Sequence, residues 1–261
     1  MRGIIYFFSV AVFRAGSKIF RITLAICQRR GHSMFGIKTS TVDAIADAPG
    51  VQQILRKLRS RQHVFERCYS QRLWGSAESG SGCGSEIAAT DDLRSYLPDL
   101  VGRLGVKVVL DAPCGDWNWM RLVDFGEVEY IGADIVPSVI DDNRSRYARP
   151  GVRFILADLA KDPLPQSDLI LCRDCWVHLS FQDIAAMLEN FRRSGATWLL
   201  VSDTPSAGRN LNKFTGASWR HLNLSLAPFH FPPPLDRQKD HHADVPFQIS
   251  LWRITDLPSI E

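Results

Sequence analysis

The sequence lacks the spaced glycines that bind a pyrophosphate. A short apolar run over 106–110 ends at Asp111, the chain continues Pro-Cys-Gly, and Gly115 is the only glycine of that turn. Dinucleotide-binding turns have three spaced glycines, which let the backbone approach the pyrophosphate. A dinucleotide cofactor and its oxidoreductase chemistry are therefore disfavoured. A nucleoside that carries a small carboxylate fits the turn better.

An apolar run long enough to cross a membrane is also lacking. Residues 4–13 are almost wholly apolar, but ten residues are too few, and Arg14 and Lys18 interrupt the run. No small-residue cleavage site marks a signal peptide. The pattern up to Cys27 suits a basic amphipathic helix. Two placements stay open: peripheral contact with a membrane through residues 1–35, or packing on the protein or a second subunit.

Excess charge of one sign is lacking as well, since the formal net charge is only +3. Its distribution is uneven: residues 1–72 hold 13 Lys and Arg against three acids, whereas residues 73–261 hold 18 against 25. Such a basic head indicates an anionic partner, a membrane surface or a nucleic acid, or else a solvated basic face. We expect a basic helical extension over 1–61 and a second domain over 62–261.

The six cysteines provide no zinc site. Cys172 and Cys175 frame two residues, but no second pair of ligands stands at zinc spacing. We therefore expect no metal. Unpaired, reduced thiols are typical of a cytoplasmic protein, which is the location we expect.

What the sequence does contain is an alternation of strand and helix patterns. Strands are expected at 106–110, 129–134, 152–157, 168–172 and 197–202, and helices at 51–73, 90–104, 136–147 and 181–193. A further helix, capped by Asp116 or Asn118, is expected after the first strand. The alternation predicts an α/β fold with a doubly wound, mostly parallel sheet and helices on both faces. The alternating tail at 248–254 predicts an antiparallel edge strand near the C-terminus.

Acidic residues stand at the ends of successive strands. Asp111, Asp134 and Asp158 end the first three, and Asp174 follows the fourth. These ends share one edge of a parallel sheet, where Asp134 can accept hydrogen bonds from ribose hydroxyls. Asp158 can accept from an adenine amine, with Leu159 against the ring. One such acid would be read as a helix cap, but three in register indicate a nucleoside site.

This order of motifs resembles the class I S-adenosylmethionine-dependent methyltransferases. Asp111 to Gly115 is similar to their first motif, Asp134 to the acid of the second and Asp158-Leu159 to the third. The usual D-x-G-x-G-x-G turn reads D-A-P-C-G-D-W here. Over about residues 62–258 the chain also resembles a group of bacterial methyltransferases that brings no established substrate. That likeness rests on WGSAESGSGCGS, LDAPCGDWNWM, YIGADIVP, LILCRDCWVHLSF and WRHLNLSLAPFHFPPP.

The resemblance implies a Rossmann-like methyltransferase fold and S-adenosyl-L-methionine as cofactor. It places the cofactor against the turn, the next strand ends and a preceding loop: Trp74, Asp111, Ala112, Cys114, Gly115, Asp134, Ile135, Asp158, Leu159 and Arg173. The Gly- and Ser-rich loop 74–85 either covers the methionine moiety or is a flexible linker. Arg173 either binds an acidic acceptor or pairs with Asp174.

Asp174 and His178 are the candidate catalytic residues, because they follow the fourth strand on the side where the methyl group should point. Methyl transfer is an in-line displacement that depends mostly on alignment. A hydroxyl or ammonium acceptor must also lose a proton, and a histidine titrates near neutrality. The alternative is that His178 only hydrogen-bonds a loop carbonyl. Trp219, Arg220, His221 and Asn223 either contact the acceptor or pack at the edge of the domain.

The leading hypothesis is an enzyme that methylates a small-molecule or lipid-linked acceptor. Two alternatives stay open: a non-catalytic S-adenosylmethionine-binding module, and a nucleic-acid methyltransferase that uses the basic N-terminal region. The second is disfavoured because the fourth strand ends in Cys-Arg-Asp. Amino-group DNA methyltransferases have Asn/Asp-Pro-Pro-aromatic there.

Overall fold

The computed structural model describes residues 8–15, 18–24, 60–240 and 247–260, with side chains from residue 60 onward. The chain divides into two compact units, 1–54 and 55–261. In the first, β1 (Phe8–Ala15) and β2 (Lys18–Leu24) pair as an antiparallel hairpin. The amphipathic helix expected there is therefore wrong for both segments. Their Val, Ile and Phe residues favour strands, and short apolar runs do not separate the two structures by periodicity.

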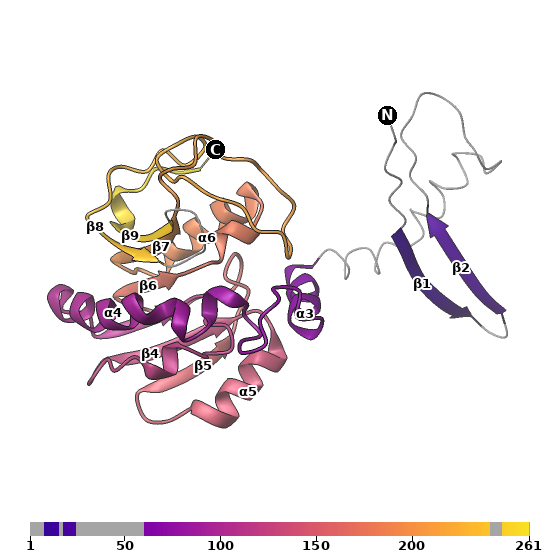
Figure 1. The fold of residues 1–261 in the computed structure, drawn as a ribbon, viewed down its shortest axis with the longest axis horizontal. Coiled ribbons are helices and arrows are strands. Elements are labelled where there is room, and N and C mark those ends of the chain that lie inside the picture. The colour runs from indigo at the N-terminus through magenta and orange to yellow at the C-terminus, as the bar shows by residue number, and fades with distance from the viewer. Residues whose placement is uncertain (1–7, 16–17, 25–59, 241–246, 261) are drawn as a thin grey trace. The chain divides into compact units, whose positions relative to one another are not determined.

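The second unit is built on a seven-stranded sheet with the order β5-β4-β3-β6-β7-β9-β8 (Figure 1). Its strands are β3 (Val108–Asp111), β4 (Glu129–Asp134), β5 (Val152–Leu156), β6 (Leu169–Cys172), β7 (Trp198–Asp203), β8 (Asp236–Asp240) and β9 (Phe247–Arg253). The first five pair in parallel, and β9 runs antiparallel to both β7 and β8. The predicted doubly wound sheet is confirmed.

The antiparallel strand near the C-terminus is also confirmed, but it is not the edge. β9 lies between β7 and β8, and the short strand β8 forms the edge. The sequence did not predict β8 because DRQKD carries four charged side chains. Charged residues are common on edge strands, where they discourage pairing with another chain.

Four helices surround this sheet: α3 (Arg61–Ser70), α4 (Asp91–Leu104), α5 (Pro137–Tyr147) and α6 (Phe181–Arg193). Local signals explain their ends. Ser180 accepts a hydrogen bond from the Asp183 amide at the start of α6, and Gly105 ends α4 in the left-handed conformation. Thr90 does not cap α4, because its hydroxyl bonds to the carbonyls of Glu86 and Ile87. Of the expected helix at 51–73, residues 51–59 lie outside the described residues.

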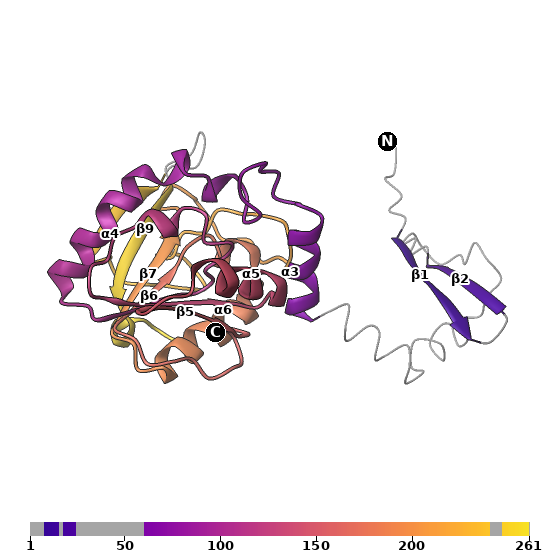
Figure 2. The same ribbon diagram turned by 90° about the horizontal axis from the view of Figure 1, so that it is seen from below.

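The two faces of the sheet carry separate hydrophobic cores. Leu93, Leu97 and Leu100 of α4 pack on one face together with Ile140 of α5. The other face packs against α6 and the segment 222–231. Figure 2 shows α4 and α6 on opposite sides of the strands. Because both faces are covered, the open carboxyl ends of the parallel strands remain as the place for a ligand.

The helix expected after β3 is absent: residues 112–119 form turns, and only the short 3-10 segment Met120–Leu122 follows. Asp116 and Asn118 therefore cap no helix here. Among the described residues, no helix is long and apolar enough to cross a membrane. The same residues contain no cluster of His, Cys, Asp and Glu side chains suited to a metal ion.

Candidate active site

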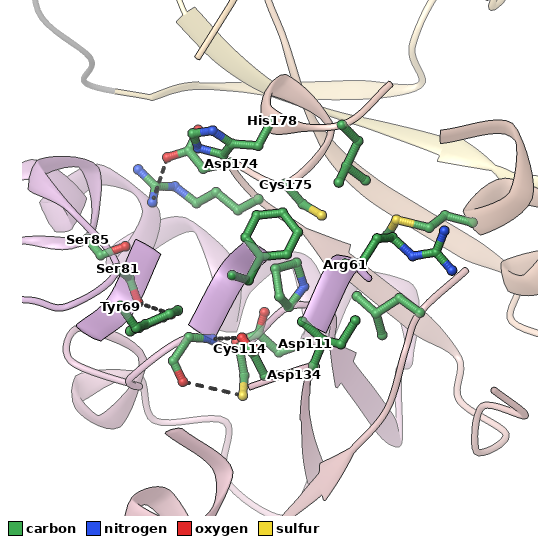
Figure 3. Close-up of a pocket in the computed structure, with 18 of the residues that line it drawn as sticks. Arg61, Tyr69, Ser81, Ser85, Asp111, Cys114, Asp134, Asp174, Cys175 and His178 are labelled. Atoms are coloured by element: carbon green, nitrogen blue, oxygen red, sulfur yellow. Dashed lines mark hydrogen bonds and ion pairs between the residues drawn. The ribbon is translucent and has the colours of Figure 1, made fainter. Parts of the chain in front are cut away.

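A cavity of about 920 Å³, counting the space at its open mouth, lies at the carboxyl ends of the parallel strands (Figure 3). Eleven of the twelve site residues expected from the sequence line it: Trp74, Asp111, Cys114, Gly115, Asp134, Ile135, Asp158, Leu159, Arg173, Asp174 and His178. Ala112 does not, because its side chain is fully buried in the core facing α6.

Asp134 lies at the centre of the cavity, at the end of β4. Its two oxygens accept hydrogen bonds from the amides of Val136 at 2.9 Å and Gly115 at 3.2 Å. Each carboxylate oxygen has two lone pairs, so both retain capacity for further donors. Burial raises the pKa of Asp134 to about 6, against the opposing effect of these amide hydrogen bonds.

Asp111 lies next to Asp134 at the end of β3 (Figure 3). The Tyr130 hydroxyl donates to it at 2.5 Å. Burial raises the pKa of Asp111 to about 7, and the Asp134 charge adds to that shift. Two adjacent buried carboxyls that both favour the neutral form are costly for an apo protein, and they are suited to a ligand with hydroxyl or ammonium donors.

Two residues of the turn after β3 have the positive φ that glycine usually adopts. Gly115 has φ +55°, and a Cβ there would lie 2.3 Å from the Ser81 hydroxyl, so only glycine fits. Trp117, in the third-glycine position, also has φ +55°. Its ring packs against Tyr130, Tyr147 and Phe154. These aromatic contacts hold a bulky residue in a conformation it rarely adopts.

Asp116 binds the serine-rich loop 76–85 to this turn. Its carboxylate accepts hydrogen bonds from the hydroxyls of Ser79 and Ser81 and from the Gly80 amide, at 2.7–3.1 Å. The Tyr69 hydroxyl in turn lies 2.7 Å from the Ser81 hydroxyl. The loop is therefore a fixed wall of the cavity rather than a flexible linker. The sequence analysis considered Asp116 only as a helix cap and missed this role.

Asp158 is already paired. Arg61 of α3 donates to both of its oxygens, at 2.8 and 3.1 Å, and reaches Asp183 of α6 at 2.5 Å. One guanidinium thus ties α3 to two acids across the cavity wall. Burial alone would lower the pKa of Arg61, but the hydrogen bonds and charges of both acids raise it above its ordinary value. Arg61 was assigned to the N-terminal extension in the sequence analysis, whereas it lies inside the second unit.

Arg173 is held by acids on both sides. It donates to both oxygens of Asp240 on β8, at 2.7 and 2.9 Å, and lies 3.3 Å from Asp174. Both Arg173 and Asp240 are almost fully buried. Burial lowers the pKa of Arg173, yet the charges of Asp240 and Asp174 keep it above its ordinary value. The expected pairing with Asp174 is present, and Asp240 was not foreseen.

His178 lines the cavity on its far side from the glycine turn, close to Asp174 (Figure 3). Its Nδ1 lies 3.3 Å from the Ser218 carbonyl oxygen, and its ring is 5.3 Å from that of Trp74. Burial lowers the pKa of His178, the charge of Asp174 opposes this, and the charge of Arg220 assists it. The imidazole is therefore neutral at pH 7.

The sequence analysis missed several side chains that line the cavity. They are Arg61, Phe65 and Tyr69 of α3, Trp119 of the turn after β3 and Met187 of α6. No periodicity distinguishes the cavity-facing side of a short helix from its core-facing side. Only the close spacing of aromatic residues before the Gly- and Ser-rich loop was a usable signal.

Comparison with known proteins agrees with this site. Residues 109–195 match the family model described as a methyltransferase domain. This match and the strand order above agree with the class I methyltransferase fold that the sequence resemblance implied. A search of curated protein sequences found no match.

Two solved structures share this fold at low identity. One is magnesium protoporphyrin IX methyltransferase from Synechocystis PCC 6803 with bound S-adenosylhomocysteine, at 16% identity and TM-score 0.50, covering 77% of this chain and 98% of that one. The other is 1,6-didemethyltoxoflavin-N1-methyltransferase from Burkholderia thailandensis, at 18% identity and TM-score 0.52. This match covers 79% of this chain and 90% of that one. At these identities the likeness concerns the fold alone.

Proposed function

We propose that this protein transfers the methyl group of S-adenosylmethionine to a hydroxyl or ammonium of a small-molecule or lipid-linked acceptor. Asp134 would bind the ribose hydroxyls, and Leu159 and Ile135 would contact the adenine. The Asp158–Arg61 pair would border the adenine, since Arg61 occupies the carboxylate that was expected to bind its amine. The Ser-rich loop and the turn at Gly115 would enclose the methionine moiety.

The observation that carries the proposal is the position of a neutral histidine in the same cavity as Asp134. A carbonyl oxygen only accepts hydrogen bonds, so Nδ1 of His178 donates its proton to Ser218. Nε2 then carries the lone pair, and a neutral imidazole with a free lone pair is a general base. The two interpretations of His178, carbonyl contact and base, are thus compatible.

Alignment supplies the rest of the reaction. The cofactor brings a methyl group on a positively charged sulfur, which leaves as a neutral thioether when the acceptor attacks in line. This chain's residues would hold the acceptor against that methyl group, and His178 would take the acceptor's proton. The aromatic side chains Phe65, Trp74 and Trp119 would exclude water around the reacting atoms.

The proposal is tested by measuring S-adenosylhomocysteine release across a panel of hydroxyl, amine and thiol acceptors. With the best acceptor, His178→Gln should lower turnover by roughly two to four powers of ten and leave cofactor affinity within about twofold. His230→Asn, an exposed histidine outside the cavity, is the control. Unchanged turnover in His178→Gln would make catalysis a matter of alignment alone. Failure of the wild type to bind the cofactor in calorimetry would overturn the proposal.

A further inference from the structure

Arg220 is a buried arginine that forms no ion pair with any acid among the residues that the structure describes. It is only 6% exposed, yet its guanidinium bonds to two backbone carbonyls, those of Val177 and Leu179, and its carbon Cζ lies 5.3 Å from the centre of the Phe181 ring. Burial lowers its pKa to about 10, which leaves it charged at pH 7. Burying a cation against neutral carbonyls is costly, so the position calls for an explanation beyond packing.

The two carbonyls lie on either side of His178. The His178 carbonyl itself accepts from the Gly216 amide at 3.0 Å, so three successive carbonyls of this turn receive donors from the segment 216–220. The same segment supplies the Ser218 carbonyl to Nδ1 of the ring. One short stretch of chain therefore holds both the backbone and the side chain of His178.

We propose that Arg220 is a positioning residue that, through the segment 216–220, fixes the imidazole of His178 with Nδ1 protonated and Nε2 free to accept a proton. This deepens the proposed function, since it concerns the base of that same site. Burial is the largest effect on the ring and favours its neutral form, and the charge of Arg220 acts in the same direction. The charge of Asp174 and the carbonyls of Ser218 and Ala217 favour the protonated form.

The chain offers a matched control in Arg192. Its guanidinium also bonds to two successive backbone carbonyls, those of Leu257 and Pro258, but it lies on α6 away from the cavity. Arg192 also pairs with Glu189, so Arg192→Met removes this ion pair together with the same kind of carbonyl contact, without touching the His178 turn. Arg220→Lys keeps the charge and loses the planar fork that can bridge two carbonyls.

The test is histidine ring NMR on the full-length protein, which reports tautomer and pKa without any acceptor. His178→Gln assigns the signals. The wild type should show the Nδ1-protonated tautomer at pH 7.5 and titrate below 6.5. In Arg220→Met the other tautomer should appear, and the pKa of His178 should rise above its wild-type value because the charge that opposes protonation is gone. In Arg220→Lys the tautomers should mix while the pKa stays low, and Arg192→Met should match the wild type.

Two results would overturn the inference. One is the observation that His178 carries its proton on Nε2 in the wild type. This measurement needs no variant, so it can overturn the inference even if Arg220→Met does not fold. The other is an unchanged tautomer and pKa in a folded Arg220→Met protein. Neither result depends on methyl transfer, so the proposed function would be judged separately by cofactor calorimetry and product release.

Discussion

At the scale of single residues, Asp134 should dominate cofactor affinity. Asp134→Asn removes the charge that would accept the ribose hydroxyls, and charge-assisted hydrogen bonds are worth about 1.5–3 kcal/mol each. We expect calorimetry to show roughly a 10- to 150-fold weaker binding of S-adenosylmethionine. Because the pKa of Asp134 is about 6, wild-type affinity should also fall as the pH drops below 6. Asp141 is an exposed acid on α5, and Asp141→Asn should change neither the cofactor affinity nor its dependence on pH.

The ionised form of Asp111 should lower the free energy of unfolding of the protein without cofactor. Its folded pKa of about 7 exceeds the ordinary 3.8, so the folded state holds the proton more tightly than the unfolded chain. The penalty is absent below pH 3.8, grows as the pH rises to 7 and is constant above. Asp111→Asn keeps an acceptor for Tyr130 and should raise the free energy of unfolding at pH 8 by about 1–3 kcal/mol.

Denaturant unfolding at pH 8 and pH 4 checks this prediction. The increase in the free energy of unfolding that Asp111→Asn causes should be largest at pH 8 and nearly vanish at pH 4. Glu127→Gln, at an exposed position, provides the comparison at each pH. A gain that is equal at both pH values would place its origin in packing instead of ionisation.

Single residues also show what the sequence allowed and what it did not. The acids at the strand ends were predictable because β-strand patterns locate each strand's last residue, and parallel strands end at one edge. Asp116, Arg220 and Asp240 were not predictable in role. Their hydrogen-bond partners described above are 35 to 67 residues away in the sequence, and no local pattern encodes such contacts.

At the scale of elements, the glycine turn and the serine loop should act as one unit. Gly115→Ala places a Cβ against Ser81 and should displace the loop, whereas Gly105→Ala, at a similar φ of +65°, meets nothing within 4 Å. Both variants should lose about 1 kcal/mol from backbone strain. Only Gly115→Ala should weaken cofactor binding and speed amide hydrogen exchange in residues 76–85. Equal cofactor binding by both variants would separate the loop from the site.

The core elements were predicted well because each carries its own end signals, such as Ser180 for α6 and Gly105 for α4. The helix expected after β3 failed for an identifiable reason. Asp116 and Asn118 are common capping residues, but here their side chains bond to the loop 78–85. A tertiary contact thus outcompetes the local signal.

At the scale of the whole molecule, the second unit should be sufficient for cofactor binding. The residues that line the cavity and those of both cores lie within residues 55–261. We expect a chain of residues 55–261 to unfold cooperatively and to bind S-adenosylmethionine within about twofold of full-length affinity. A truncated chain that does not fold would mean that residues 1–54 contribute to the domain's packing.

Residues 1–54 are predicted to account for any membrane contact. Full-length protein should sediment with anionic vesicles at low salt and be released at high salt, since exposed charges are screened. The truncated chain should stay in the supernatant under both conditions. Vesicle binding that survives truncation would move the contact to the second unit.

The position of Asp240 constrains the order in which the chain can assemble. It is the buried partner of Arg173, but its strand β8 joins the described sheet only through β9, which is synthesised later. Until residues 247–253 have paired with β7, nothing in the sheet fixes Asp240 opposite Arg173. The wall of the cavity therefore depends on the last described strand in the sequence, and a chain that ended before β9 would lack the strand that holds Asp240 in the sheet.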